Sequence, residues 1–159
     1  MKNYFDLTGQ VAVVTGCSTG LGVQMAKALA NQGAKIVAIA RRKDKIDAVA
    51  KEIAETYKVE TLAVQCDITD TEKVNAAVDE IVAKFGRIDI LINNAGTGAV
   101  APAEDITDDQ FNGELNVDLG GTFKMARAVA KKAMINAKYG RIINIASMYG
   151  LVGNKVAPC

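Results

Sequence analysis

The chain has no histidine and no tryptophan, and only three cysteines and two prolines among its 159 residues. Without histidine, the commonest general base and metal ligand is absent, so acid–base chemistry has to come from Tyr, Lys, Ser, Asp or Glu. The cysteines Cys17, Cys66 and Cys159 are odd in number and follow no metal-ligand spacing. This pattern argues against a disulfide framework and against a metal centre.

Strong net charge and long apolar runs are missing as well. The formal net charge is +1, and basic residues are spread along the chain, so no nucleic-acid or membrane-surface partner is expected. No apolar stretch reaches the length of a membrane span, and the first residues lack the apolar core of a signal peptide, which predicts a cytoplasmic location. Half of the residues are hydrophobic and 23% are charged, as expected of one globular domain over residues 1–159.

Strand and helix patterns alternate along the chain. Apolar, β-branched runs predict strands near residues 10–15, 35–40, 59–66, 87–93 and 140–146. Helical periodicity predicts helices near residues 20–32, 43–57, 71–85, 107–118 and 121–137. Thr69 and Glu72 fit a capping box for the third helix. The alternation predicts an α/β fold with a doubly wound parallel sheet, and we expect about five strands in the order 3-2-1-4-5.

The most informative motif is a glycine-rich segment, residues 15–22, with the sequence TGCSTGLG. It lies between a buried strand pattern and a helical pattern, where glycine lets the backbone approach a pyrophosphate whose charge the helix N-terminus favours. Cys17 in this segment is either a small filler or a thiol whose pKa the helix N-terminus lowers. The expected nucleotide contacts are Gly16, Ser18, Thr19, Gly20, Leu21 and Gly22.

A second glycine-containing turn, NNAG at residues 93–96, directly follows the fourth predicted strand. Taken alone, it is equally consistent with an ordinary asparagine-rich turn. In the strand order 3-2-1-4-5, however, the first and fourth strands are neighbours, so both turns border one crevice at the carboxyl ends of the strands. We therefore expect Asn94, Ala95 and Gly96 to contact the nucleotide.

The residues after the second predicted strand bear on which nucleotide binds. Dinucleotide folds often place an acidic residue there, against the adenosine ribose. This chain has Arg41 and Arg42 instead, and a guanidinium can form a bidentate pair with a 2′-phosphate. The alternative is a solvated basic start of the next helix. NADP(H) is thus the expected cofactor, with NAD(H) as the alternative.

Asp67 and Ile68 follow the third predicted strand, at the same edge of the sheet. Asp67 is placed to accept a hydrogen bond from an adenine amino group, or to start the turn before the third helix. Both roles stay open, and we include both residues in the expected cofactor site.

Three strings together resemble the short-chain dehydrogenase/reductase family: residues 15–22, residues 93–96, and GRIINIAS at residues 140–147. The resemblance extends over essentially the whole chain. It implies a Rossmann fold, with hydride exchange between a nicotinamide cofactor and a ketone or secondary alcohol. Residues 145–154 are most similar to gluconate 5-dehydrogenase-like or 3-oxoacyl reductase-like members. The family fold has further strands after the five expected here.

Carried over residue by residue, the resemblance assigns Ser147 to the substrate carbonyl, which suits a hydroxyl at the end of a strand. The family's catalytic asparagine falls at Asp118, counted from GTF at residues 121–123. An aspartate cannot donate the hydrogen bonds of an amide, so a proton relay through this position lacks its donor.

The family's general acid is a tyrosine with a lysine four residues later, whose charge lowers the phenol pKa. None of the tyrosines in this sequence has a lysine at that spacing; they are Tyr4, Tyr57, Tyr139 and Tyr149. The family places this pair further along the chain than the serine. We therefore expect the 159-residue chain to bind nucleotide without turnover.

The sequence thus predicts an oxidoreductase acting on a small carbonyl or alcohol. It also predicts a homo-oligomer, because Ile142, Ile143 and Ile145 form an apolar strand at the edge of the expected sheet. One alternative is a non-catalytic nucleotide-binding module. Another is a methyltransferase-like Rossmann domain, against which the basic pair after the second strand counts, since a carboxylate is the usual partner of a ribose diol.

Overall fold

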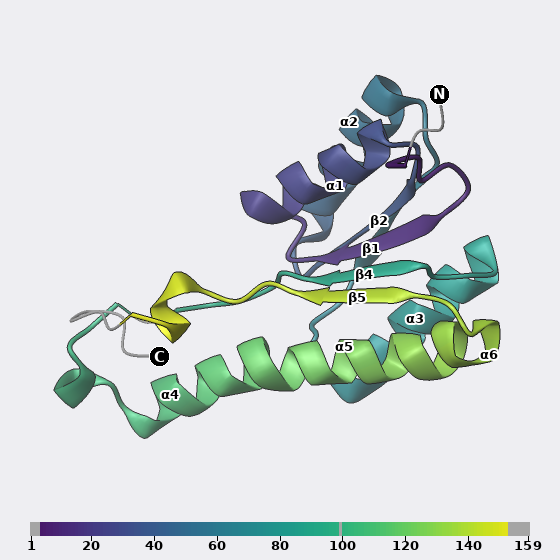
Figure 1. Cartoon of the computed structure of the whole chain (residues 1–159). Helices are drawn as coiled ribbons and strands as arrows, with labels where there is room; N and C mark the ends of the chain where they lie inside the picture. Colours follow the sequence, from purple (N-terminus) through teal and green to yellow (C-terminus); the bar gives the residue numbers. More distant parts are fainter. Residues whose placement is uncertain (1–3, 99, 153–159) are drawn as a thin grey trace.

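The computed structural model describes residues 4–98 and 100–152, so Cys159 and two residues of the 145–154 segment lie outside the described part. Its centre is a parallel five-stranded sheet in the order β3-β2-β1-β4-β5, which confirms the predicted order (Figure 1). The strands are β1 (Val11–Thr15), β2 (Lys35–Ala40), β3 (Thr61–Gln65), β4 (Ile90–Asn93) and β5 (Arg141–Asn144). The switch between β1 and β4 forms the crevice edge that the sequence predicted.

Helices cover both faces of this sheet (Figure 1). On one face, α1 (Leu21–Asn31) and α2 (Lys43–Tyr57) pack over side chains such as Val14 and Ile36. On the other face, α3 (Thr71–Phe85) packs over Val13 and Leu91. β1 is buried along its whole length because alternate side chains enter these two cores.

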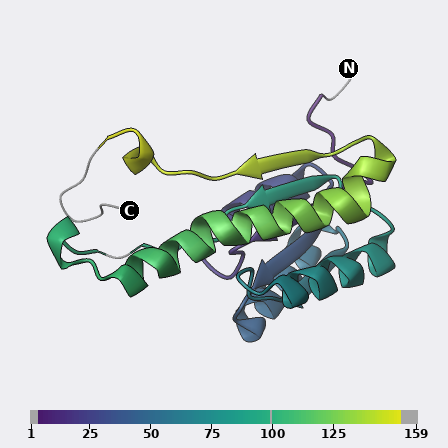
Figure 2. The ribbon, with the colours of Figure 1, turned by 90° about the horizontal axis from the view of Figure 1, so that it is seen from below.

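A long helical rod lies beside α3, on the same face of the sheet, as Figure 2 shows. Two separate helices with a gap at residues 119–120 were expected here, and that prediction is wrong. The rod consists of α4 (Asp108–Leu115), η2 (Asn116–Gly121), α5 (Thr122–Val129), η3 (Ala130–Met134) and α6 (Ile135–Ala137).

The π-helical segment η2 spans the expected break, and a second π-helical segment, η3, lies further along the rod. The glycine at position 121 serves packing, because a Cβ on Gly121 would lie 2.5 Å from Ile68 Cδ1. Gly121 therefore lets the rod approach the turn after β3, without interrupting the helix.

The N-terminus of α3 differs from the predicted capping box. Asp70 is the N-cap, and its carboxylate accepts hydrogen bonds from the backbone N–H groups of Glu72 and Lys73. Thr69 is occupied elsewhere, because its hydroxyl donates to Asp67 Oδ1 at 2.8 Å. The helix begins at Thr71, as predicted, but its N-cap is Asp70 and not Thr69.

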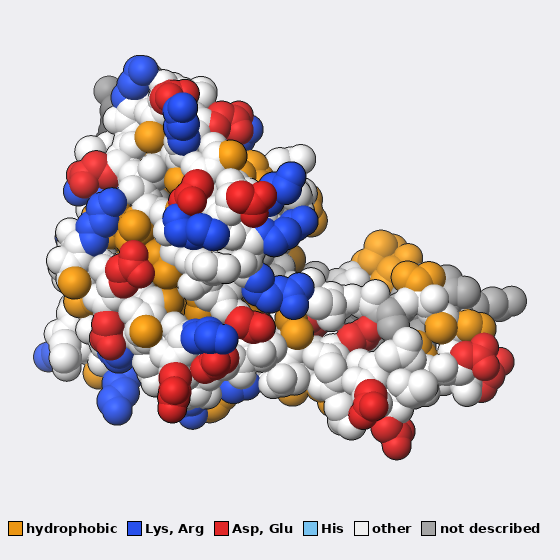
Figure 3. All heavy atoms as spheres, turned by 180° about the vertical axis from the view of Figure 1, so that it is seen from behind, with side chains coloured by type: hydrophobic (Ala, Val, Ile, Leu, Met, Phe, Trp, Pro, Cys, Tyr) orange, Lys and Arg blue, Asp and Glu red, His pale blue; other side chains and the backbone are white. Residues whose placement is uncertain are grey.

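The sheet ends at β5, whose residues are all exposed on the described chain. The side chains of Ile142, Ile143 and Ile145 are 40%, 47% and 41% exposed. An apolar strand at the edge of the sheet was predicted here. The α4 end of the rod and the segment after β5, which includes η4 (Met148–Gly150), project beyond the sheet (Figures 1 and 3). Within the described residues, no helix is long and apolar enough to span a membrane.

Candidate functional site: a nucleotide crevice

One buried side chain, Thr15, joins the two glycine-containing turns. Its Oγ1 accepts hydrogen bonds from the backbone N–H groups of Asn94 and Ala95, both at 3.0 Å. In return, Asn94 Nδ2 donates to the Thr15 carbonyl at 3.0 Å. The turn after β4 is thereby fixed against the end of β1, so the two motifs border one crevice as predicted.

Glycine is required where the two turns touch. A Cβ on Gly16 would lie 2.8 Å from Ala95 Cα, and one on Gly22 would lie 2.6 Å from the Gly16 carbonyl oxygen. Both distances are shorter than a carbon side chain tolerates, and Gly16 also has a positive φ of 67°. These two glycines therefore serve the close approach of backbone to backbone.

Gly20 is different, because a Cβ built on it meets no described atom within 4 Å. It is the N-cap of α1, with φ 65° and ψ −139°, a conformation that favours glycine. No described side chain caps this helix end. The open space beside uncapped N–H groups at a helix N-terminus fits a pyrophosphate.

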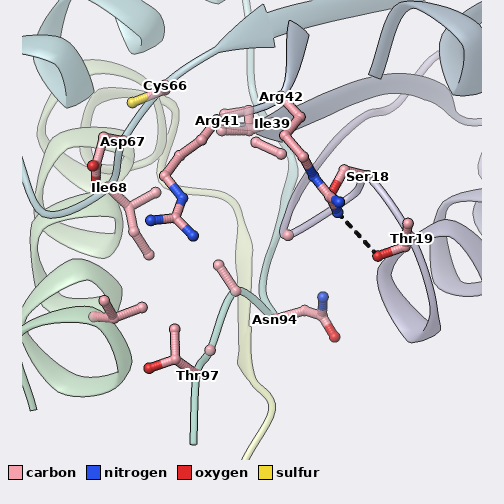
Figure 4. A pocket seen from close by; sticks show the side chains of 15 residues that line it. Ser18, Thr19, Ile39, Arg41, Arg42, Cys66, Asp67, Ile68, Asn94 and Thr97 are labelled. Atoms are coloured by element: carbon pink, nitrogen blue, oxygen red, sulfur yellow. Dashed lines mark hydrogen bonds between the residues drawn. The ribbon is translucent and has the colours of Figure 1, made fainter. Parts of the chain in front are cut away.

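A cavity of about 450 Å³ opens beside the glycine-rich loop, at Gly16, Ser18 and Thr19, and is within the size range of small-ligand sites (Figure 4). It lies across the carboxyl ends of β1, β2, β3 and β4. Of the expected cofactor residues, ten line it: Gly16, Ser18, Thr19, Arg41, Arg42, Asp67, Ile68, Asn94, Ala95 and Gly96. The other three, Gly20, Leu21 and Gly22, belong to the adjoining loop and first turn of α1 and are not among its lining residues.

The two arginines after β2 are oriented differently. Arg42 Nη2 donates to Ser18 Oγ at 2.7 Å and to Thr19 Oγ1 at 3.3 Å, which holds its guanidinium beside the glycine loop. The Arg41 guanidinium instead points into the cavity, between Asp67 and Asn94 (Figure 4). Both arginines line the cavity, on its β2 side.

Asp67 both lines the cavity and builds the turn after β3. Its Oδ1 accepts from the Thr69 backbone N–H at 3.0 Å and from the Thr69 hydroxyl at 2.8 Å. These two hydrogen bonds, the backbone one first, lower the pKa of Asp67, and Arg41 adds a smaller effect in the same direction. The turn-forming role is present in the structure, and the carboxylate still faces the cavity.

Cys17 behaves as a filler and not as a reactive thiol. It is fully buried, and its Sγ lies 3.5 Å from the Gly22 carbonyl oxygen. Burial raises the pKa of the Cys17 thiol to about 12, opposite to the lowering that its place near a helix N-terminus suggested. Desolvation outweighs the helix end because the side chain points into the core. Cys66 is also buried, and desolvation raises its pKa to about 11.

The two expected catalytic residues lie near the β4 and β5 side of the crevice, outside the cavity lining. Asp118, in η2, accepts the Thr97 backbone N–H through Oδ1 at 2.9 Å. Ser147 is the N-cap of η4, where its Oγ accepts the Tyr149 N–H at 3.2 Å. Ser147 follows β5, whose end is held to β4 by the 2.9 Å bond from Ile145 N to the Asn93 carbonyl.

Sequence reasoning missed several lining residues, among them Thr97 and Val117, as well as the clamp Thr15. A signal for Thr15 exists: it is the one hydroxyl at the end of an otherwise apolar strand. The two hydrogen bonds that Thr15 Oγ1 accepts come from Asn94 and Ala95, which are far away in the sequence, so no local pattern indicates them. Across the described residues, no group of three acidic or cysteine side chains could hold a metal ion.

Comparisons with known proteins bear on the family and the fold of the chain. A family model described as short chain dehydrogenase matches residues 10–159. The chain is 39% identical over 148 residues to the D-threitol dehydrogenase of Mycolicibacterium smegmatis, covering 93% of this chain and 56% of that protein. It is 35% identical to the 2-dehydro-3-deoxy-D-gluconate 5-dehydrogenase of Escherichia coli K12, covering 97% of this chain and 60% of the relative. The chain therefore spans little more than half the length of these relatives.

Solved structures are similar over the same region. NAD+-bound xylitol dehydrogenase superposes with a TM-score of 0.90 at 36% identity, covering 94% of this chain and 57% of that one. A metagenomic short-chain oxidoreductase in complex with NADP superposes with a TM-score of 0.85 at 38% identity, covering 96% and 67% of the two chains. One of these structures holds NAD+ and the other NADP.

Proposed function

Since the chain belongs to the short chain dehydrogenase family, we propose that it is the nucleotide-binding part of an NADP(H)-preferring oxidoreductase acting on a ketone or secondary alcohol. The observation that carries the proposal is the clamp of Thr15 on the Asn94 turn, which makes one cavity from two glycine motifs. A cytoplasmic location stays a prediction from the sequence.

The residues present fit a nicotinamide dinucleotide. The open N-terminus of α1 at Gly20 suits the pyrophosphate. The cavity borders the adjoining loop at Ser18 and Thr19, and it extends toward β2 and β3 on one side and toward β4 on the other. When bound, the cofactor supplies or accepts the hydride. In the proposed site Ser147 Oγ hydrogen-bonds the substrate oxygen and stabilises the negative charge that develops there.

The phosphorylated cofactor is proposed because two guanidinium groups border the β2 side of the cavity. A titration calorimeter measures the affinities for NADP+ and NAD+ of the unmodified chain and of an Arg41→Ala/Arg42→Ala double variant. One charge-assisted contact is worth about 1.5–3 kcal/mol, so the double variant should lose most of a preference of about ten- to hundredfold. Lys43→Ala removes a neighbouring cation that pairs with Asp47 on α2 and serves as the control.

Equal affinities for the two nucleotides in the unmodified chain would refute the NADP(H) preference. Absence of binding by either nucleotide would refute the proposed function itself. Titration with S-adenosylmethionine tests the methyltransferase alternative, which predicts that this ligand binds and that the nicotinamide nucleotides do not.

Catalysis is proposed for a polypeptide that adds a tyrosine and a lysine four residues on, because none of the four tyrosines in this sequence has that partner. We expect residues 1–159 to show no measurable NADPH-dependent carbonyl reduction, since removing a general acid costs about 10²–10⁴-fold. Turnover by this chain that survives Ser147→Ala would contradict the mechanism. An extended polypeptide that binds nucleotide but stays inactive would favour the non-catalytic module.

Self-association is proposed for the chain with this sequence. The exposed isoleucines of the β5 edge present unpaired backbone and apolar side chains, a combination that favours pairing with another chain. Further large exposed apolar side chains recur at four-residue spacing along the rod: Phe111, Leu115, Leu119 and Phe123. Light scattering that gives the mass of a stable monomer would contradict this proposal, and Ile143→Lys should reduce the association if the edge causes it.

A further inference from the structure

The charged side chains around the cavity are distributed unevenly. Its charged lining residues, Arg41, Arg42 and Asp67, all follow β2 or β3. The lining residues that follow β4, at positions 94–97, are uncharged, as is Val117 of the rod. Behind this uncharged side lies Asp118, the residue at which this chain departs from the asparagine of its family.

The Asp118 carboxylate is held against the β4 side by one hydrogen bond, which its Oδ1 accepts from the Thr97 backbone N–H at 2.9 Å. It also lies close to Gly96, since a methyl group built on that glycine would be 3.4 Å from the same oxygen. Gly96 and Thr97 both line the cavity. The carboxylate therefore adjoins the part of the wall that Gly96 and Thr97 form, where its charge can act on a bound group.

The orientation of a dinucleotide in this fold follows from the strand order. The adenosine ribose lies at the end of the second strand and the pyrophosphate at the first helix N-terminus, so the other nucleoside lies on the side of the fourth strand. In this chain that side is the one bordered by Gly96, Thr97 and Asp118. The nicotinamide ring is the part of the cofactor whose charge changes with its oxidation state.

We propose that Asp118 is a specificity-determining residue for the oxidation state of the bound nicotinamide. The inference rests on the proposed function and goes beyond it. The oxidised ring carries one positive charge that the reduced ring lacks, so a nearby carboxylate favours binding of the oxidised form. An asparagine at this position would have the same size without this preference.

The consequence concerns the direction of the reaction. In carbonyl reduction the reduced ring gives up a hydride, the carbonyl carbon accepts it, the resulting alkoxide takes up one proton, and the ring gains one positive charge. A group that stabilises this positive charge makes the bound reduced cofactor the stronger hydride donor. Asp118 thus biases the bound equilibrium toward the alcohol.

The test compares affinities and needs no turnover. Dissociation constants for NADP+ and NADPH are measured for the unmodified chain and for Asp118→Asn, whose amide oxygen still accepts the Thr97 N–H. Asp109→Asn, an exposed change of the same charge in the first turn of α4, is the matched control. Charges interacting across a partly solvated wall are worth about a three- to tenfold change in affinity.

We expect the ratio of the NADPH constant to the NADP+ constant to fall by about this factor in Asp118→Asn and to stay unchanged in Asp109→Asn. The difference should shrink in high salt, because the site is exposed to solvent. Asp118→Ala should lower the ratio by the same factor if the charge acts. If Asp118→Asn leaves the ratio unchanged while Asp118→Ala weakens both nucleotides equally, the carboxylate only positions the Thr97 backbone, and the inference is refuted.

Failure of the proposed function gives a different result. In that case neither nucleotide binds the unmodified chain, whereas failure of the Asp118 inference leaves both nucleotides bound at an unaltered ratio. The two outcomes are read from the same titrations.

Discussion

Thr15→Val is the most informative single substitution in this fold. Valine has nearly the shape of threonine and suits a buried strand, but it cannot accept hydrogen bonds. Thr15 is 0% exposed, and its hydroxyl oxygen accepts two backbone N–H groups at 3.0 Å each. The variant therefore leaves the N–H groups of Asn94 and Ala95 without this acceptor, while the packing around β1 stays nearly the same.

The expected loss in the free energy of unfolding is about 1–3 kcal/mol in total. This is less than two fully buried, unsatisfied donors would cost, because Asn94 and Ala95 are only half-buried. Denaturant unfolding measures it. Thr15→Ser is the control: it keeps the oxygen and loses one methyl group, so it should cost about 1 kcal/mol. In calorimetry, Thr15→Val should also bind NADP+ more weakly than Thr15→Ser, because the Asn94 turn is no longer fixed to β1.

A Thr15→Val protein as stable as the unmodified chain, with unchanged nucleotide affinity, would refute this reasoning. Such a result would mean that the turn after β4 is held by the Asn94 side chain alone, whose Nδ2 donates to the Thr15 carbonyl in either variant.

Three other expectations follow from the site. Gly22→Ala places a methyl carbon 2.6 Å from a glycine-loop carbonyl, so nucleotide binding should be lost with little change in far-UV circular dichroism; retained affinity would contradict the site. In a Cys159→Ser background, thiol reagents at pH 8 should modify native Cys17 far more slowly than the unfolded chain, because burial raises its pKa to about 12. Since hydrogen bonds from Thr69 lower the Asp67 pKa, the ionised carboxylate stabilises the fold above its unfolded pKa of about 3.9. Asp67→Asn should therefore be less stable at pH 6, and the difference should vanish as the pH falls through the lower folded pKa.

The sheet was predictable because its central strands carry continuous β-branched runs, which few other structures accommodate. The ends of the strands were harder to predict. β4, for example, begins at Ile90 and not at the predicted residue 87. Asp89 explains part of this, because its carboxylate Oδ2 takes the Val11 N–H at 2.8 Å and is held by Arg87. A side chain that replaces a backbone partner does not appear in a hydrophobic pattern.

The helical rod shows a second kind of limit. Two consecutive glycines, Gly120 and Gly121, favour a break when only local propensity is considered. The structure keeps them helical because Gly121 has to pack against Ile68, a residue that lies before α3. Long-range packing of this kind overrides local preference and cannot be seen in one sequence.

The position of the two glycine-containing turns at one crevice was predictable. Glycine at a strand-to-helix turn has a specific physical use, and the predicted strand order places the second turn beside the first. The orientation of Arg42 was not predictable, since it depends on the hydroxyls of Ser18 and Thr19. The same holds for the high pKa of Cys17, which depends on whether its side chain faces the core or the crevice.

The central claim is that one dinucleotide lies across both glycine-containing turns. Amide hydrogen exchange of the chain with and without NADP+ tests it most directly. We expect slower exchange both in residues 16–22 and in residues 94–97, while the solvent-facing side of α2 exchanges as before. Protection confined to one of the two turns, or found only outside them, would contradict the account.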